Sequence, residues 1–452
     1  MTLTFDSAVA ATDAAVHNGS RFPRDLRIAT DTRTLSAGET YLALRGERFD
    51  GHDYIDRALE LGASAIIVDN TGSVPEHVPA LVVQDTTRAY MALAGAARAR
   101  FGGRVIAITG STGKTTTKVL LTQLLAARYG TRVAASPANE NNEIGVSKLL
   151  LSLDSSHDVA IVEMGARHNG DILPLVKIAQ PHIGVLTNIG EAHLEIMGST
   201  ENLIATKWEV FAGGAQAILN SQDAASRARA ASLDGSPLWF GVGEVYEAGA
   251  FVLDHSHLSV RAGERETRYA IDARLPGTHN LFNLSAAICA ALALDVAIAE
   301  IVARIPTLSL PSGRYETIRI DGRPRIVFDA YNASLSGMIA TLDAFAAETG
   351  AQRIAVLASM AELGMQAAEM HEQAGERAAV TGIDRLLVGG EFAGELASGA
   401  RKGGLSSDRI VQYADNADAV RWLRAHAHVN DVVLLKGSRV YKLEEVVEGL
   451  RA

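Results

Sequence analysis

The amino-acid sequence predicts an α/β protein of three domains: a small N-terminal α/β domain, a larger central domain around a parallel sheet, and a C-terminal Rossmann-like domain. Three observations support this fold class. The 452 residues exceed the size at which a single hydrophobic core keeps growing. Short apolar runs alternate with helical segments, which is typical of parallel sheets covered by helices. Glycine or proline clusters interrupt this alternation and place the domains at residues 1–102, 103–312 and 313–452.

The first domain is predicted from two short apolar runs, at residues 41–44 and 65–68, which stand next to turn signals or a helical stretch. Residues 87–100 are rich in alanine and are expected to form a helix. Because Gly102 and Gly103 follow this helix directly, we expect a hinge between the first and second domains there.

The central domain begins with an apolar run at residues 104–109, which is followed by a glycine-rich loop and by helical spacing at residues 115–127. This order predicts a strand, a loop and a helix. Further buried strands are expected at residues 159–162, 183–186 and 217–219, with helical or loop segments between them. The pattern favours a mostly parallel sheet with helices on both faces.

The C-terminal domain starts a new series of apolar runs after Gly313. We expect strands at residues 325–329, 354–357, 385–388 and 432–435, with helices between them. A third α/β domain of Rossmann-like type follows from this alternation.

Composition and charge exclude several functions. The formal net charge is −10 and Lys and Arg form no long runs, so the chain is not expected to bind nucleic acid through its phosphate backbone. The one cysteine, Cys289, allows neither an internal disulfide nor a cysteine-cluster metal site, and its alanine neighbours predict a buried thiol. We find neither a signal peptide nor an apolar run of ~20 residues that could span a membrane. We therefore expect a cytoplasmic protein and, by default, a monomer.

The strongest local signal is a glycine-rich loop between a predicted strand and a predicted helix. Its sequence is Gly110-Ser111-Thr112-Gly113-Lys114-Thr115-Thr116. Glycines let the backbone wrap a phosphate, and the N–H groups at the start of the helix face the anion. Lys114 offers a positive charge and Thr115 can ligate magnesium. Ile108 stands where the P-loop pattern has its first glycine, but the groups that would contact phosphate are all present.

Two further side chains follow predicted strands of the central sheet. Glu163 comes directly after the run at residues 159–162, and His193 follows the run at residues 183–186. The carboxyl edge of a parallel sheet is where α/β proteins bind ligands, and magnesium prefers one or two carboxylates plus phosphate oxygens. We therefore expect both side chains at a metal or phosphate site, with a surface carboxylate and a structural histidine as the alternatives.

Taken together, these motifs resemble those of the Mur ligase family. The ATP-binding domain of that family is similar to residues 110–116, 163–165, 187–193, 207–211 and 277–283. Further motifs resemble the branch of the family that adds D-alanyl-D-alanine, namely residues 31–33, 46–52, 329–333, 362–364 and 436–439. The match covers nearly the whole chain in order, which makes the combined pattern far more specific than any single motif.

The resemblance implies an ATP-dependent ligase that activates a carboxylate as an acyl phosphate, couples it to an amine, and releases ADP and phosphate. The implied reaction joins D-alanyl-D-alanine to a UDP-N-acetylmuramoyl tripeptide in peptidoglycan precursor synthesis. The implied catalytic residues are Lys114, Glu163, His193 and Lys207. Two Mg²⁺ ions would be held by Thr115, Glu163, His193 and a carbamylated Lys207. From the residues alone Lys207 would be a solvated helix residue, and that alternative stays open.

The resemblance also implies binding residues. ATP would contact Gly110, Ser111, Thr112, Gly113, Lys114, Thr115, Thr116, His279, Asn280, Asn283, Arg314 and Asp329. The UDP moiety would contact Thr32, Arg33, Gly46, Phe49 and His52, and the rest of the substrates would contact Asn139, Asn141, Asn142, Asn332, Lys436 and Arg439. For Lys436 and Arg439, binding of the dipeptide carboxylate and a structural ion pair are both open.

Some substrate-side positions depart from the family pattern, namely Ala138, Glu140, Ser147, Ser334, Leu335, Ala358 and Ser359. Glu140, for example, puts a charge where the family has an apolar or aromatic residue. The phosphate and metal residues are intact, so the open question is which acid and amine the protein joins. The alternatives are a paralogue that joins another acid and amine in a secondary pathway, and a noncatalytic or simple P-loop ATPase module.

Overall fold

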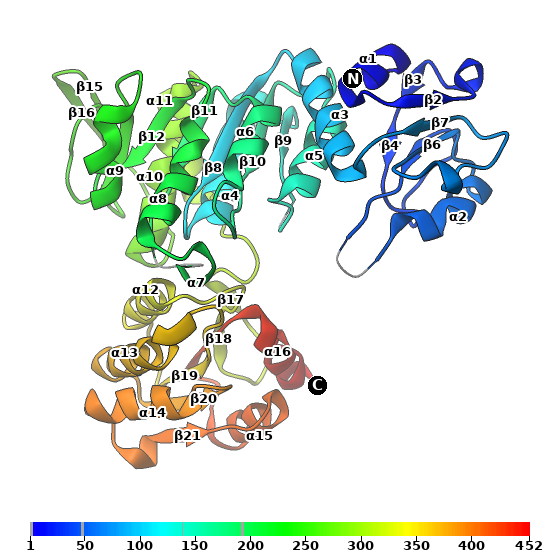
Figure 1. Ribbon diagram of the computed structural model, residues 1–452. Helices are drawn as coiled ribbons and strands as arrows, with labels where there is room; N and C mark the ends of the chain where they lie inside the picture. The colour runs from blue at the N-terminus through cyan, green and yellow to red at the C-terminus, as the bar shows by residue number, and fades with distance from the viewer. Residues whose placement is uncertain (1–2, 47–48, 138, 191–193) are drawn as a thin grey trace.

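The computed structural model describes residues 3–46, 49–137, 139–190 and 194–452 (Figure 1). Within these residues the chain forms three large sheets, one in each predicted domain, and a two-stranded sheet near the N-terminus. The N-terminal domain lies beside the central domain, whereas the C-terminal domain lies below it in Figure 1. The predicted three-domain α/β fold is therefore confirmed.

The N-terminal sheet has the strand order β2-β7-β6-β5-β4, and β4 to β7 run parallel. Its strands are β2 (Ala15–His17), β4 (Ile28–Ala29), β5 (Thr40–Leu42), β6 (Ala65–Val68) and β7 (Ala80–Val82). β1 (Leu3–Thr4) pairs with β3 (Asp25–Leu26), while α1 (Phe5–Thr12) and α2 (Ile55–Glu60) pack against opposite faces of the sheet. The apolar runs at residues 41–44 and 65–68 thus supply β5 and β6, as predicted.

Helix α3 (Thr86–Arg100) joins the first two domains, and it begins at Asp85, whose carboxylate accepts a hydrogen bond from the Arg88 backbone N–H. Its buried side chains pack into both the N-terminal core and the core of the central domain. Arg98 fixes the end of the helix, because its guanidinium donates to the backbone oxygens of Ala179 and Gln180. Gly102 and Gly103 follow this helix and precede β8, and the hinge expected there stays a prediction.

The central sheet has the order β16-β15-β14-β13-β12-β11-β8-β10-β9. Its strands are β8 (Arg104–Thr109), β9 (Val133–Ala135), β10 (Val159–Glu163), β11 (Ile183–Leu186), β12 (Gln216–Asn220), β13 (Leu238–Val242), β14 (Gly249–Asp254), β15 (His257–Ala262) and β16 (Arg265–Ala270). All pairs are parallel except β14-β15 and β15-β16. We did not predict β9, β13, β14, β15 and β16. Polar residues dominate β16 at the exposed edge and leave no buried run to detect there, whereas β13 and β14 do carry buried apolar residues that our sequence reading passed over.

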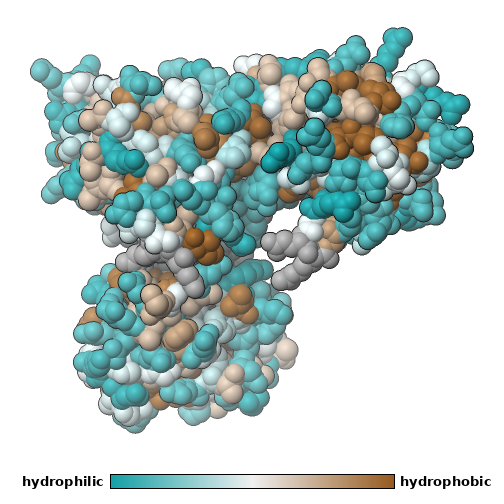
Figure 2. Space-filling view, in the orientation of Figure 1, coloured by the Kyte–Doolittle hydropathy of each residue, from teal (hydrophilic) through white to brown (hydrophobic). Residues whose placement is uncertain are grey.

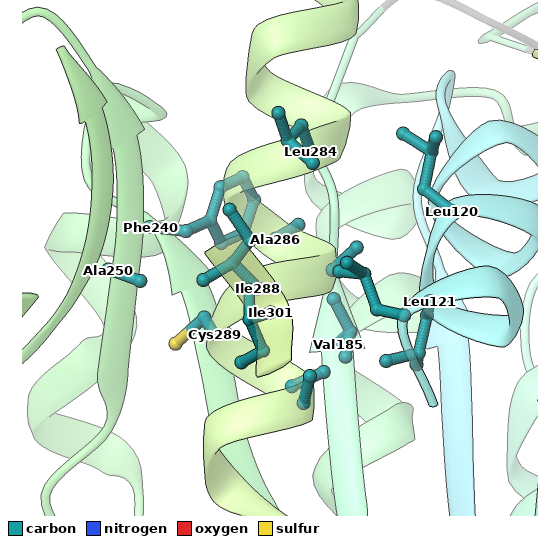
Figure 3. Packing of buried hydrophobic residues seen from close by; sticks show 14 of the residues in the cluster. Leu120, Leu121, Val185, Phe240, Ala250, Leu284, Ala286, Ile288, Cys289 and Ile301 are labelled. Carbon is teal, nitrogen blue, oxygen red and sulfur yellow. The ribbon is translucent and has the colours of Figure 1, made fainter. Parts of the chain in front are cut away.

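Helices cover both faces of the central sheet. On one face lie α4 (Lys114–Tyr129), α10 (Thr278–Ala293) and α11 (Ile298–Arg304), and on the other lie α5 (Glu143–Ser152), α6 (Ile172–Ala179) and α8 (Thr200–Trp208). The short helices α7 (Leu194–Met197) and α9 (Ala224–Arg229) complete the domain. Strand β8 contributes to both cores, since Ile106 and Ile108 face α4 while Val105 and Ala107 face α5. Figure 3 shows the first core, with Cys289 buried among its apolar side chains.

The C-terminal sheet has the order β17-β18-β22-β19-β20-β21, parallel except for β17. Its strands are β17 (Glu316–Ile318), β18 (Arg325–Asp329), β19 (Arg353–Ala358), β20 (Arg385–Gly389), β21 (Ile410–Gln412) and β22 (Val432–Lys436). Its helices are α12 (Leu335–Phe345), α13 (Ala367–Val380), α14 (Ala393–Lys402), α15 (Asn416–His426) and α16 (Glu444–Arg451). All four predicted strands of this domain are present. Among the described residues, no helix combines the length and apolar character that crossing a membrane requires.

Candidate active site

A cavity of about 1280 Å³ opens at the carboxyl edge of the central sheet, where the C-terminal domain faces it. Most of the predicted phosphate, nucleotide and dipeptide residues line it. They are Ser111, Thr112, Gly113, Lys114, Thr115, Thr116, Asn139, Asn141, Asn142, Glu163, His279, Asn280, Asn283, Arg314, Asp329, Asn332, Lys436 and Arg439. Thus four separate stretches of the central domain and three of the C-terminal domain meet at one cavity. His193 lies outside the described residues.

The glycine-rich loop leaves the start of helix α4 open to an anion. Gly113 precedes the helix in the left-handed region, at φ 80°, and no side chain caps the first N–H groups. The other side of the loop is tightly packed, because a Cβ on Gly110 would come within 1.9 Å of Thr187 Oγ1. The two helices α5 and α8, in contrast, begin with side-chain caps, Asn142 and Ser199. The uncapped start of α4 therefore suits a phosphate.

The Lys114 ammonium folds back over the loop. Its Nζ donates to Gly110 O at 2.7 Å and to Ser111 O at 3.3 Å. Burial lowers the pKa of Lys114, although the nearby Glu163 carboxylate opposes that shift. A phosphate at the loop would offset this burial and stabilise the charged amine.

Glu163 ends strand β10, and three neighbours converge on its carboxylate. Thr115 Oγ1 and Asn141 Nδ2 each donate to Oε1 at 3.1 Å. Lys118 Nζ lies 2.8 Å from Oε2 as an ion pair, without the alignment of a hydrogen bond. Burial alone would raise the pKa of Glu163, but the charges of Lys118 and Lys114 outweigh it and lower the pKa. The carboxylate is therefore ionised and buried, which rules out the surface-carboxylate alternative.

Lys118 was missed by sequence reasoning. It stands one turn after Lys114 on α4, and a residue four positions on along a helix shares the same face. The spacing of the two lysines was visible in the sequence. The ion pair was not, because Glu163 lies on strand β10 and meets Lys118 only in the folded protein.

Magnesium fits the residues around Glu163. Among the described residues no three His, Cys, Asp or Glu side chains cluster as a metal site. Magnesium needs no such cluster, since it is usually held by one or two carboxylates, water and substrate phosphates. Thr115 Oγ1 and Glu163 Oε1 are oxygen donors 3.1 Å apart, next to the phosphate-binding loop. These donors fit a magnesium ion that is held in part by nucleotide phosphates.

Lys207 lies near the end of α8, and its side chain is buried with 1% exposure. The alternative of a solvated helix residue is thus wrong. Burial, helped by the charge of Lys114, lowers the pKa of Lys207 to about 7, while Asp171 acts in the opposite direction. The helix is held against the loop after β10, because Thr206 Oγ1 donates to Asn169 Oδ1 at 2.8 Å. Lys207 itself is not among the residues that line the cavity. Asn169 and Asp171 do line it, and the sequence had not singled them out.

The start of α10 forms the wall of the cavity next to the glycine-rich loop. Asn283 Oδ1 accepts a hydrogen bond from Thr117 Oγ1 at 3.3 Å, and its amide donates to Asn280 Oδ1 at 3.3 Å. Burial lowers the pKa of His279, so its imidazole is neutral at neutral pH. This wall offers neutral polar groups, as expected where a nucleoside is bound.

The C-terminal domain brings two kinds of basic residue to the cavity. The Arg314 guanidinium stacks 4.3 Å from the Tyr331 ring centre, and its buried Nε has no hydrogen-bond partner among the described residues. Lys436, in contrast, is committed to a buried ion pair, with its Nζ 3.0 Å from Asp329 Oδ2. Of the two alternatives for Lys436, a structural ion pair and a site for the dipeptide carboxylate, the structure supports the ion pair. Arg439 is more exposed and lies 3.6 Å from Glu444.

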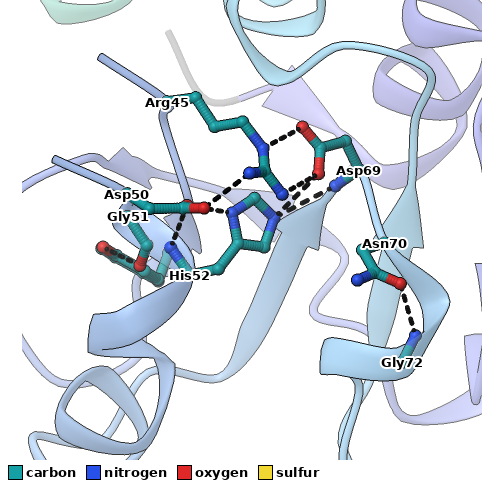
Figure 4. Close-up of polar contacts among 8 residues, drawn as sticks. Arg45, Asp50, Gly51, His52, Asp69, Asn70 and Gly72 are labelled. Atoms are coloured by element: carbon teal, nitrogen blue, oxygen red, sulfur yellow. Dashed lines mark hydrogen bonds and ion pairs between the residues drawn. The ribbon is translucent and has the colours of Figure 1, made fainter. Parts of the chain in front are cut away.

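The residues predicted to bind UDP lie apart from this cavity. None of Thr32, Arg33, Gly46, Phe49 and His52 lines it. Arg33 is exposed beside Asp31, to which it donates. His52 lies between two carboxylates, with Nδ1 2.6 Å from Asp50 Oδ1 and Nε2 3.3 Å from Asp69 Oδ1 (Figure 4). Arg45 contacts both aspartates, so this network ties Arg45 and Asp50 to Asp69, which follows β6, and the nearby Phe49 is exposed.

The departures from the family pattern are accommodated locally. The charge of Glu140 is matched by Lys148, whose Nζ lies 2.7 Å from Oε1. Ser334 caps α12 by accepting from Gly337 N, and the buried Ser359 accepts from Phe392 N at 2.9 Å. The others are Ala138, which lies outside the described residues, and Ser147, Leu335 and Ala358, which are buried.

Fold and site together define a P-loop nucleotide-binding enzyme whose phosphate site faces a Rossmann-like domain across one cavity. Comparison with known families agrees domain by domain. Residues 27–100 match the model described as Mur ligase family, catalytic domain, residues 108–291 match the Mur ligase middle domain, and residues 313–439 match the Mur ligase, glutamate ligase domain. The chain belongs to the Mur ligase family.

Individual relatives support the same assignment. The UDP-N-acetylmuramoyl-tripeptide--D-alanyl-D-alanine ligase of Synechocystis sp. is 35% identical over 445 residues, which cover 97% of this chain and 94% of the relative. A crystal structure of MurF from Acinetobacter baumannii superposes with a TM-score of 0.88 at 28% identity, over 100% of this chain and 99% of that one. MurF ligase from Thermotoga maritima, in complex with ADP, has a TM-score of 0.80 at 29% identity, over 94% and 97%. The resemblance drawn from the sequence is therefore confirmed.

Proposed function

We propose that this protein is an ATP-dependent peptide ligase that joins D-alanyl-D-alanine to a UDP-N-acetylmuramoyl tripeptide in peptidoglycan precursor synthesis. The observation that carries the proposal is that the phosphate loop and Glu163 line one cavity, with the buried Lys207 near enough for the charge of Lys114 to lower its pKa, in a chain that matches a ligase of that name over 97% of its length. The enzyme would act in the cytoplasm, as a monomer, with residues 1–102 holding the UDP-linked substrate.

The first step brings two anions together, the tripeptide carboxylate and the triphosphate of ATP. A carboxylate oxygen of the tripeptide attacks the γ-phosphorus of ATP, the bond to the β,γ-bridging oxygen breaks, and ADP leaves. This step needs positive charge around the phosphates. Lys114, the uncapped start of α4, and Arg314 from the opposite domain would supply it. The product is an acyl phosphate on the tripeptide.

The second step forms the peptide bond. The amine of the dipeptide attacks the acyl carbon, the C–O bond to phosphate breaks, and the amine loses a proton. Water has to be kept out, since an acyl phosphate hydrolyses readily. The C-terminal domain faces the loop across the cavity, so its closure would shield the intermediate and bring the dipeptide close. Asn332 and Arg439 line that side and would contact the dipeptide.

Magnesium, when bound, would neutralise charge on the phosphates. Thr115 and Glu163 would hold one ion through Oγ1 and Oε1. Lys207 would contribute to a second site after reaction with carbon dioxide. With a pKa of about 7, roughly half of its amine is neutral and nucleophilic near pH 7. The nitrogen would form a bond to carbon, lose a proton and become a carbamate, an anion in place of a cation.

Phosphate release by the purified protein tests the proposed function. We expect turnover with Mg²⁺, ATP, the UDP-linked tripeptide and D-alanyl-D-alanine, and none when any one of the four is left out. A matched panel would replace one substrate at a time with another nucleotide-linked acid or another amine. Turnover only with a different pair would overturn the substrate assignment and leave the ligase chemistry standing.

A paralogue with other substrates is the second candidate, and one observation favours it. The Glu140–Lys148 pair places two charges beside Asn139 and Asn141, which line the cavity. If this pair contacts the acid substrate, the variant Glu140→Leu should change the KM for the acid in the same panel. The KM for ATP should stay the same.

A further inference from the structure

Lys118 and Glu163 form a buried ion pair beneath the phosphate loop. Their side chains are only 4% and 3% exposed, and Lys118 Nζ lies 2.8 Å from Glu163 Oε2. Lys118 is also held by the backbone, since its Nζ donates to Pro137 O at 3.4 Å. Both charges are therefore fixed in place.

The two oxygens of Glu163 have different surroundings. Oε1 faces polar groups of the cavity, because it accepts from Thr115 Oγ1 and Asn141 Nδ2. Oε2 faces Lys118 and has no hydrogen-bond partner among the described residues. Thus one oxygen is directed at the proposed metal position and the other at a buried cation.

Without nucleotide, the described residues leave little negative charge at this position for a divalent cation. Glu163 is the one carboxylate among them that contacts Lys118, and the ion pair balances its charge. A divalent cation alone would therefore gain little there. Phosphate oxygens at the loop would add the missing negative charge.

We propose that Lys118 is a positioning residue that keeps Glu163 a one-oxygen ligand, so that a divalent cation enters the Thr115–Glu163 position together with nucleotide and not alone. The proposal rests on the proposed function, because it concerns the same metal position. It adds an order of binding to that function: the metal–nucleotide complex binds, and the free ion does not. Lys118 need not contact substrate for this role.

Binding of Mn²⁺ alone, followed by electron paramagnetic resonance on the full-length protein without nucleotide, tests this role. Wild type should bind Mn²⁺ weakly. Lys118→Met frees both oxygens of Glu163 and removes one positive charge, so its Kd for Mn²⁺ should fall at least about tenfold. Lys118→Arg restores the charge and should stay within about threefold of wild type. Lys402→Met is the matched control, because Lys402 pairs with Glu372 on the surface, and it should match wild type.

A double variant assigns the new binding to Glu163. Lys118→Met/Glu163→Gln should lose the gain, and a gain that persists would overturn the proposal. So would a Kd for Lys118→Met within about twofold of wild type in a protein whose thermal melting shows a folded state. Should Lys118→Met fail to fold, Lys118→Gln keeps a hydrogen-bonding group beside Oε2 and carries the same expectation.

Binding of Mg-ATP to wild type separates the two proposals. If wild type binds no Mg-ATP, the proposed function fails. If wild type binds Mg-ATP and Lys118→Met gains no affinity for Mn²⁺ alone, only the role of Lys118 fails.

Discussion

Asp329 and Lys436 end two neighbouring parallel strands and form a buried ion pair, with Lys436 Nζ 3.0 Å from Asp329 Oδ2. Lys436 also donates to Asn332 O at 3.0 Å, and Thr341 Oγ1 donates to the same oxygen of Asp329. The two side chains are thus partners of each other at the wall of the cavity. A substrate carboxylate would have to compete with Asp329 for Lys436.

Replacing Lys436 should therefore destabilise the C-terminal domain. Lys436→Met leaves the Asp329 carboxylate buried without its cation, which costs about 3–5 kcal/mol. Urea unfolding would measure the loss. Lys402→Met breaks an exposed pair and should cost less than about 1 kcal/mol. A stable Lys436→Met protein with a raised KM for the dipeptide would instead show that Lys436 binds substrate.

Carbon dioxide should be needed for full activity if Lys207 becomes a carbamate. We expect the rate of phosphate release to fall in buffer stripped of carbon dioxide and to recover when bicarbonate is added. Lys207→Ala should lose at least about 100-fold in kcat and gain nothing from bicarbonate, as expected for a group that acts on the transferring phosphate. The exposed Lys177 is the matched control, and Lys177→Ala should keep the wild-type response. Equal rates with and without carbon dioxide would contradict the carbamate.

The burial of Lys207 also predicts a pH dependence of stability. Its pKa is lowered to about 7 in the folded protein, so between pH 7 and the unfolded value of about 10.4 the unfolded chain binds more protons. Stability contributed by this residue therefore rises with pH in that window, by about 1 kcal/mol between pH 7 and pH 8. The comparison is wild type against Lys207→Met, unfolded in urea in buffer free of carbon dioxide. Parallel pH profiles for the two proteins would refute the shift.

Glycine at position 113 should be essential for nucleotide binding. A Cβ there would come within 2.3 Å of Asn283 Oδ1, and the residue has φ 80°, which costs a side chain about 1–3 kcal/mol of strain. Gly113→Ala should raise the Kd for ADP at least about tenfold in calorimetric titration. Gly102→Ala is the matched control, since nothing lies within 4 Å of its Cβ and its φ is not positive. Similar affinities for the two variants would mean that the loop does not hold phosphate.

Local sequence predicted many of the strands and the loop that begins the site. The runs at residues 183–186 and 325–329 are the strands β11 and β18 to the residue, and the loop before α4 has the expected form. The edge strand β16 was missed because its exposed, polar residues form no apolar run, whereas β14 was missed although its residues are buried. Only packing reveals that α3 belongs to two cores, because its contacts come from segments far along the chain.

The sequence by itself determined the phosphate loop, since its glycines, its lysine and the following helix are consecutive and need no distant partner. Only the tertiary structure decided the state of the buried charges. Asp329 and Lys436 are 107 residues apart in the sequence. Lys118 on helix α4 pairs with Glu163 on strand β10. Lys207 is buried by the elements around α8. Burial and pairing depend on which segments pack together, and the pKa of a lysine follows from both.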